Sequence, residues 1–162
     1  MFREMRRIRQ KLDQTEVNEI LLNSSTGILG VIGENGYPYT VPVNYTYTNG
    51  AVYIHCAITG HKVDALKACD KVSFTVVSED EVVPSTFSTN YKSVIGFGKA
   101  SIVEENTEKR LALDSLVDKY SSSFKEEGNR EIEREWSLVS IIKIEFDHIS
   151  GKTAKSLVKS GK

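Results

Sequence analysis

The sequence contains few of the residues that most often reveal a protein's class. Its 162 residues include two cysteines, three prolines and one tryptophan, and the formal net charge is −1. Cys56 and Cys69 form no CxxC pair, and the spacings of Cys56, His55, His61 and His148 match no zinc pattern, so no metal site is predicted. The balanced charge argues against nucleic acid or a membrane surface as a partner.

Long apolar runs are also missing. The N-terminal stretch MFREMRRIRQKLDQ is basic, but no apolar region follows it, which argues against a secretory signal. Without a transmembrane run or a secretory signal, we expect a cytoplasmic protein with reduced thiols. The length favours one domain, placed at residues 1–150, followed by a Lys/Ser/Gly-rich tail at 151–162.

The sequence does contain a strong pattern of β-hairpins. Asn35-Gly36 and Asn49-Gly50 are typical hairpin turns, because both residue types tolerate the positive φ of a type I′ turn. These turns separate three segments that are predicted as strands at 27–33, 37–47 and 51–57. Three consecutive antiparallel strands predict a meander.

The remaining pattern predicts a small barrel with helices at its corners. Predicted helices span 14–24 (capped by Asp13 or Thr15), 62–69 and 107–120, with a short helical turn at 129–136. Further strands are predicted at 71–77, 93–103 and 137–150, with a polar loop at 78–91. Gly96 and Gly98 indicate a bulge or a close backbone approach. The predicted fold class is mainly β, with about six antiparallel strands in a closed or split barrel, since closure removes exposed strand edges.

The segment YIHCAITGHKVDALKACDK, residues 53–71, predicts a strand that enters a helix through a polar turn. A helix N-terminus offers unpaired N–H groups and the positive end of the helix dipole, which suit a phosphate. Thr59 adds a hydroxyl, Gly60 allows close approach, and His61 and Lys62 add donors and charge. The same residues also suit a simple capped helix, so by themselves they leave both interpretations open.

Three longer stretches carry a resemblance to a known family. GYPYTVPVNYTY, GAVYIHCAITGHKVDAL and YKSVIGFGKA occur in the order and at the spacing of that family. In these stretches the sequence resembles the FMN-binding split-barrel family related to pyridoxamine 5′-phosphate oxidase, and within it the nitroimidazole-resistance (Nim-type) flavoproteins. The resemblance runs from MRRIRQKLD to HISGK, and it implies a six-stranded antiparallel split β-barrel with flanking helices that binds FMN.

The resemblance also implies a role for each matching segment. The strand that would run along the isoalloxazine ring matches Val41, Pro42, Val43 and Asn44. The strand end that would border the ring matches His55, Cys56 and Ala57, and the turn that would take the phosphate matches Thr59, Gly60, His61 and Lys62. The segment that would reach the cofactor from a neighbouring subunit matches Tyr91, Lys92, Ser93 and Val94. A homodimer with cofactor sites at its interface is therefore implied.

Individual side chains suggest further roles. His55 is the candidate catalytic residue, because an imidazole near a flavin could deliver a proton or orient a substrate; a hydrogen bond to a neighbour is the alternative. Adjacent strand residues face opposite sides, so Cys56 is expected in the apolar core. Trp136 is expected to anchor a core or an interface, and stacking on a flavin is the alternative. Lys152 is expected to be solvated or to approach the cofactor.

The sequence departs from the family pattern in two places. Ile8 stands where Nim-type chains have a lysine, and EREWSLVSIIKIEFDHISGK offers no match for the arginine and histidine that hold pyridoxal phosphate in the oxidase. The resemblance therefore implies an FMN-dependent oxidoreductase that passes electrons to a small acceptor, such as a nitroaromatic, rather than the oxidase itself. The alternatives are a non-catalytic flavin carrier or sensor, an F420- or haem-binding barrel, and an empty barrel that serves as an interaction module.

Overall fold

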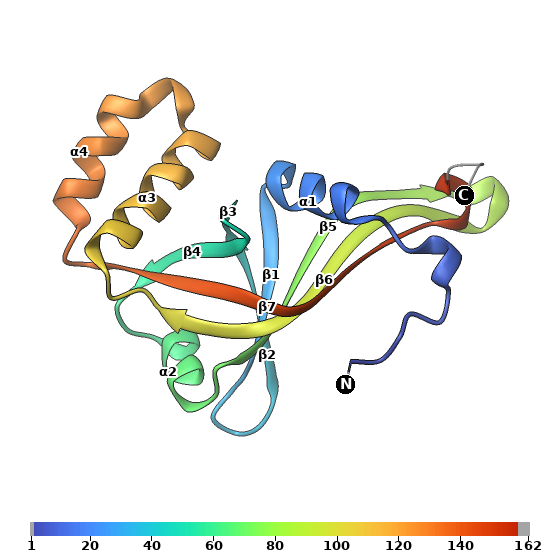
Figure 1. Cartoon of the computed structure of the whole chain (residues 1–162), viewed down its shortest axis with the longest axis horizontal. Helices are drawn as coiled ribbons and strands as arrows, with labels where there is room; N and C mark the ends of the chain where they lie inside the picture. The colour runs from blue at the N-terminus through green and yellow to red at the C-terminus, as the bar shows by residue number, and fades with distance from the viewer. Residues whose placement is uncertain (1, 159–162) are drawn as a thin grey trace.

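The computed structural model describes residues 2–158 as a strongly twisted sheet with flanking helices (Figure 1). The strands are β1 Thr26–Ile32, β2 Pro38–Asn44, β3 Thr46–Thr48, β4 Ala51–Ala57, β5 Lys71–Val83, β6 Ser88–Ile102 and β7 Val139–Thr153. The α-helices are α1 Gln14–Asn23, α2 His61–Ala68, α3 Asn106–Tyr120 and α4 Lys125–Glu135. The 3₁₀ turns are η1 Ile8–Gln10, η2 Pro84–Thr86, η3 Ser122–Phe124 and η4 Lys155–Leu157.

All neighbouring strands are antiparallel, and their order in the sheet is β2-β1-β5-β6-β7-β4-β3. The two edge strands, β2 and β3, are consecutive in the chain and are separated by Tyr45 alone. The sheet must therefore curl until its two edges approach each other, and β2 contacts β4 across the remaining gap. This arrangement confirms the mainly β, split-barrel fold class, with seven strands in place of six.

The predicted meander is wrong because the segment 37–47 does not form one strand. It divides at Tyr45 into β2, which pairs with β1, and β3, which pairs with β4. The side chain of Tyr45 is fully buried, and its hydroxyl donates to the carbonyl of Leu21 at 2.8 Å. At this buried residue the chain leaves β2, at one edge of the sheet, and enters β3, at the other edge.

Local signals for turns and caps were largely correct. Asp13 caps α1 in a capping box, accepting from the Glu16 backbone N–H at 2.9 Å, whereas Thr15 lies inside the helix. Both Asn49 and Gly50 have positive φ, as a type I′ turn requires. At the other predicted hairpin turn only Gly36 has positive φ, so the hairpin is present but its turn is of another type.

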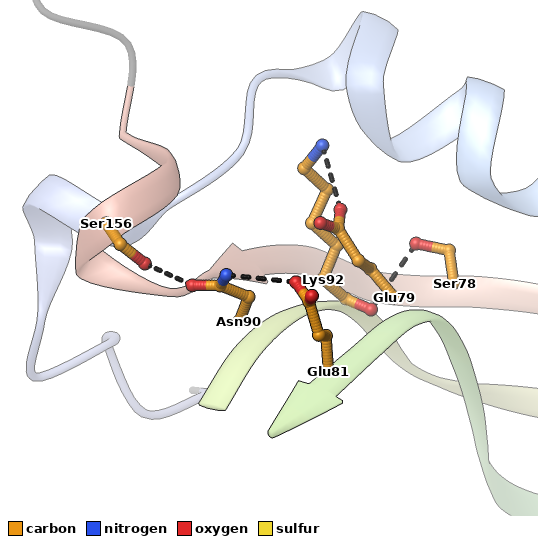
Figure 2. A network of polar contacts seen from close by, with 6 residues as sticks. All are labelled: Ser78, Glu79, Glu81, Asn90, Lys92 and Ser156. Carbon is orange, nitrogen blue, oxygen red and sulfur yellow. Dashed lines mark hydrogen bonds and ion pairs between the residues drawn. The ribbon is translucent and has the colours of Figure 1, made fainter. Parts of the chain in front are cut away.

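The predicted polar loop at 78–91 is wrong. The strands β5 and β6 continue through it as a hairpin that turns at 84–87. Figure 2 shows the polar contacts that hold its outer half: Lys92 pairs with Glu79 at 3.2 Å, and Asn90 donates to Glu81 at 3.2 Å. Ser156 of η4 also contacts Asn90, at 2.5 Å. These polar pairs across the strands stabilise the outer half of the hairpin.

The two glycines of β6 confirm the predicted bulge and close approach. The register between β6 and β7 shifts between Phe97 and Gly98. A Cβ at Gly98 would lie 2.0 Å from the carbonyl oxygen of Glu145, and one at Gly96 would lie 2.3 Å from the ring of Phe146. Only glycine fits at these two positions, because the neighbouring strand β7 lies so close to β6 there.

The interior consists of two apolar clusters. The larger one fills the barrel and includes Leu29, Tyr45, Phe74 and Ile144. The second lies between the sheet and the helical hairpin α3–α4, and it includes Ala112, Leu113, Ile132 and Ile141. The helical hairpin thus has its own apolar support at one end of the sheet, opposite the end at which β7 finishes (Figure 1).

Two predicted boundaries differ from the structure. The helical turn at 129–136 is a full helix, α4, which starts at Lys125. The tail at 151–162 begins inside the sheet, since β7 runs to Thr153 and Gly151 and Thr153 are buried. The end of the predicted tail, 159–162, lies outside the described residues. Between residues 2 and 158, no helix is long and apolar enough to cross a membrane.

Candidate functional site

A large cavity lies where the ends of β2 and β4 meet the helical hairpin α3–α4. Its volume is about 680 Å³. The sheet contributes three of the predicted site residues, Asn44, His55 and Cys56. The rest of the lining comes from the helices and from the start of β7, and comprises Leu113, Leu116, Val117, Tyr120, Ser121, Phe124, Glu127, Gly128, Glu131, Ile132, Glu135, Leu138 and Val139.

His55 and Cys56 occupy opposite faces of β4, as alternation along a strand requires. Cys56 is 6% exposed and packs in the barrel core, which confirms the prediction of apolar burial. His55 is exposed and belongs to the outward face. Of the two side chains, His55 is therefore the one placed to meet a ligand.

The positive charge of Lys62, in the polar turn, affects the pKa values of both His55 and Cys56 at the end of β4. Although the His55 side chain is exposed, protein atoms around the ring displace part of its hydration; this desolvation, and secondarily the positive charge of Lys62, lowers the pKa of His55 below its ordinary value. Burial raises the pKa of the Cys56 thiol, and Lys62 opposes this rise only in part. The imidazole is consequently neutral at neutral pH, and the thiol is protonated and unreactive.

The polar turn 59–62 leads into α2 with backbone N–H groups that remain free. Gly60 has φ +128°, a conformation that favours glycine, and its carbonyl accepts the N–H groups of Val63 and Asp64 at 2.8 and 3.0 Å. Within residues 2–158, the backbone N–H groups of His61 and Lys62 have no hydrogen-bond acceptor. Two free N–H groups, the Thr59 hydroxyl and the Lys62 ammonium form a donor set that suits a phosphate.

The side chain of His61 is engaged elsewhere. Its ring stacks on Tyr39 of β2, with centroids 4.3 Å apart and planes 15° apart. This contact also holds the start of α2 against the β1–β2 hairpin. The backbone of His61 remains part of the donor set, but its imidazole is committed to packing.

Strand β2 has an unpaired edge whose backbone groups could contact a ligand. Val43 is buried and Val41 is half-buried, both packing in the barrel core, while Pro42 and Asn44 face outward. Because β2 pairs with β1 only, its other edge leaves alternate backbone groups free for a ligand. The Asn44 side chain donates to the carbonyl of Ser25 at 3.1 Å, which fixes the end of the strand beside the cavity.

The predicted segment Tyr91–Val94 is not brought to this site within one chain. Ser93 pairs with Lys152 of β7, whereas His55 pairs with Ile141 of the same strand. Eleven residues of β7 separate these two positions, which corresponds to roughly 35 Å along an extended strand. Its contribution from a neighbouring subunit stays a prediction.

Two other predicted side chains lie outside the cavity. Lys152 is half-buried and its Nζ lies 5.5 Å from the centre of the Tyr91 ring, far from His55 along β7. Trp136 packs against the second core, and Lys109 lies over its ring at 4.5 Å. Residues 2–158 contain no group of three or more His, Cys, Asp or Glu side chains arranged to hold a metal ion.

Sequence reasoning missed most of the helical wall. A helix was predicted at 107–120, but not that Leu113, Leu116 and Tyr120 of α3 line the same cavity as His55. The glutamates of α4 were not identified as a site at all. Their spacing of four residues, at 127, 131 and 135, is the signal that could have placed them on one helix face.

Comparison with known proteins extends this description. The model of a family described as pyridoxamine 5′-phosphate oxidase matches residues 13–153. A proposed 5-nitroimidazole antibiotic resistance protein from Bacteroides thetaiotaomicron is 26% identical, with a TM-score of 0.73 and coverage of 88% of this chain and 86% of that one. No curated protein matches the sequence significantly.

Two further solved structures share the fold at lower identity. A conserved hypothetical protein from Mycobacterium tuberculosis is 19% identical, with a TM-score of 0.83 and coverage of 98% of this chain and 96% of that one. A flavocytochrome from Azotobacter vinelandii is 22% identical, with a TM-score of 0.74 and coverage of 94% and 72%. These identities support the fold, and the fold alone.

Proposed function

Because the chain belongs to the pyridoxamine 5′-phosphate oxidase family, whose model covers residues 13–153, we propose that it is a cytoplasmic, homodimeric FMN-binding oxidoreductase. The observation that carries the proposal is the junction of β4 and α2. There, two free backbone N–H groups and a glycine at φ +128° lie beside Lys62, whose charge acts on His55, and this donor set would suit a phosphate. When bound, FMN would supply the redox chemistry, accepting electrons from a donor such as a reduced nicotinamide and passing them to a small acceptor.

The protein's own residues would bind the cofactor and orient the acceptor. Thr59, Gly60 and Lys62 would hold the phosphate, and the free backbone edge of β2 at residues 41–44 would meet the polar edge of the ring. His55 would face the acceptor as a neutral imidazole, able to hydrogen-bond it and hold it in position. The apolar walls of the cavity would exclude water from the reacting groups.

An exposed apolar face supports the homodimer. Ile28, Val77, Ile95 and Phe97 project from the same side of β1, β5 and β6, and each is between 40% and 50% exposed. The register fixes their neighbourhood, since Ile28 and Ile95 both pair with Thr75. We call these four residues the outer sheet face. A two-fold axis through it would bring one subunit's Tyr91–Val94 segment toward the other subunit's site.

The first experiment is a visible absorption spectrum of the purified full chain, before and after addition of FMN and desalting. Retained bands near 370 and 450 nm (roughly where oxidised flavins absorb) would support the cofactor assignment. A protein that never retains FMN would sink it, and F420 and haem would then be tested. Haem is included because the similar A. vinelandii protein is a flavocytochrome.

A second experiment separates turnover from simple carriage of the flavin. The FMN-loaded wild type and His55→Gln are reduced anaerobically and mixed with a nitroaromatic acceptor. The proposal expects His55→Gln to retain FMN and to reoxidise at least tenfold more slowly, because the mutation removes a group that faces the acceptor. Equally slow reoxidation of both proteins by every acceptor would favour a carrier or sensor.

A further inference from the structure

The charged residues that line the cavity beside His55 are all acidic. Its sixteen lining residues include three glutamates, Glu127, Glu131 and Glu135, and no lysine or arginine. Most of the other lining side chains are apolar or aromatic, among them Leu116 and Phe124. A cavity of about 680 Å³ with apolar walls and few charges has the size and character of a small-molecule site.

The helix α4 places all three carboxylates on this cavity. The glutamates lie four residues apart, so they share one face of the helix. Gly128 lets this face approach α3 closely, since a Cβ there would lie 2.7 Å from a methyl carbon of Val117. The three glutamates therefore form a row along one helix face at the open rim of the cavity, where their side chains are 62%, 56% and 40% exposed.

Nearby cations only partly balance this row. Arg130 lies 3.8 Å from Glu127, and Arg134 pairs with Glu131 and Glu135. Both arginines are about 70% exposed, and exposed ion pairs of this kind contribute little and are screened by water. Two lysines are also near: Lys62 acts on His55, and Lys119 lies over the Tyr45 and Tyr120 rings. Neither lysine lines the cavity.

We propose that this cavity is the acceptor site, and that it selects flat apolar molecules that carry a protonated amine over those that carry a carboxylate or a phosphate ester. The inference rests on the proposed function only in assigning the cavity to the acceptor. The apolar walls would hold the flat ring, the aromatic side chains of Tyr120 and Phe124 could contact a cation, and the glutamates would pair with the ammonium. An anionic group would meet these carboxylates, and no lysine or arginine lines the cavity.

The test uses three probes of nearly equal size and shape that differ in charge: 4-nitrobenzylamine, 4-nitrobenzyl alcohol and 4-nitrobenzoate. Dissociation constants are measured by calorimetry on the full chain, both flavin-free and FMN-loaded, at pH 7 and low ionic strength. We expect the amine to bind at least tenfold more tightly than the benzoate, with the alcohol between them. Equal affinities, tighter binding of the benzoate, or no binding of any probe would overturn the proposal.

Matched variants locate the effect. The triple variant Glu127→Gln, Glu131→Gln and Glu135→Gln should reduce the preference for the amine to less than threefold. The control, Glu126→Gln with Glu133→Gln, removes charge from the same helix at exposed positions outside the cavity and should keep the preference. A preference that survives in the triple variant, with circular dichroism showing both variants folded, would contradict the role of the glutamates.

The outcomes also separate this inference from the proposed function. Selective amine binding by a protein that never retains FMN would leave the inference standing and remove the flavoprotein assignment. Retention of FMN without any charge preference would do the reverse. Because binding to the flavin-free chain is measured directly, neither result depends on turnover.

Discussion

The phenol oxygen of Tyr120 lies within hydrogen-bond distance of both backbone polar atoms of Tyr45. It accepts from the Tyr45 N–H at 3.0 Å and lies 2.8 Å from the Tyr45 carbonyl oxygen, and the Ser25 carbonyl oxygen is 2.6 Å away. Tyr45 is the residue at which the chain leaves β2 for β3. A side chain from α3 thus satisfies the backbone at the point where the two edges of the sheet meet.

Tyr120→Phe should therefore destabilise the fold. Removing the hydroxyl leaves the half-buried N–H of Tyr45 without its acceptor, which costs about 1 to 3 kcal/mol in free energy of unfolding. Urea denaturation of the wild type and the variant measures this difference. Tyr37→Phe is the control, because Tyr37 is 77% exposed and should change stability little. Equal stabilities of Tyr120→Phe and the wild type would show that water replaces the bond.

The phosphate assignment predicts a loss of cofactor affinity. Thr59→Ala combined with Lys62→Ala removes a hydroxyl and a positive charge from the turn, and should weaken FMN binding more than tenfold, or by more than about 1.4 kcal/mol. Fluorescence titration of FMN with the flavin-free protein gives the affinity. Lys67→Ala, at the other end of α2, is the matched control. An unchanged affinity in a folded double variant would remove the phosphate assignment.

The ammonium of Lys119 predicts a dependence of stability on pH. Its Nζ is buried without a hydrogen-bond partner among residues 2–158, and lies 4.0 Å from the centre of the Tyr45 ring. Burial lowers the pKa of Lys119 from 10.5 to about 8. The folded protein therefore releases this proton before the unfolded chain does. Stability should rise with pH between about 8 and 10.5, and the cost of the buried charge is present in full below about 8.

Lys119→Met should abolish this rise and should stabilise the protein at pH 7. The gain is about 1 kcal/mol, because the side chain of Lys119 is only half-buried and the Tyr45 ring attracts its ammonium, which together offset much of the cost of burying the charge. Thermal and urea unfolding at pH 7 and at pH 10 check both expectations. Lys67→Met, at an exposed position on α2, should leave the pH profile unchanged. A loss of stability at pH 7 would mean that the attraction between the ammonium and the ring is the larger effect.

If the outer sheet face is the dimer interface, a charge placed in it should separate the two subunits. Ile95→Glu places a charge at the centre of an apolar patch, and should convert a dimer into monomers without reducing helix or strand content. Light scattering after size-exclusion chromatography gives the mass, and circular dichroism gives the fold. Ser101→Glu, further along the same strand, is the control and should remain dimeric. A wild type that is monomeric at micromolar concentration would contradict the homodimer itself.

The sequence by itself determined the local elements. Asp13 and Glu16 specify the start of α1, Asn49-Gly50 specifies a type I′ turn, and the change of period after Gly60 marks the entry into α2. These signals depend on residues within one helical turn or one hairpin, so no distant contact is needed to read them. The predicted phosphate turn belongs to the same class, because its donors come from four consecutive residues.

Only the tertiary structure decided where the distant parts meet. The division of segment 37–47 at Tyr45 follows from burial of its ring and from Tyr120, 75 residues away. The strands at 78–83 and 88–92 resemble a loop in sequence because most of their residues are polar, and pairing across the hairpin is what orders them. The cavity likewise depends on the packing of α3 and α4 beside β4, which is far from them in the sequence. The only local sign of it in the sequence is the four-residue spacing of three glutamates.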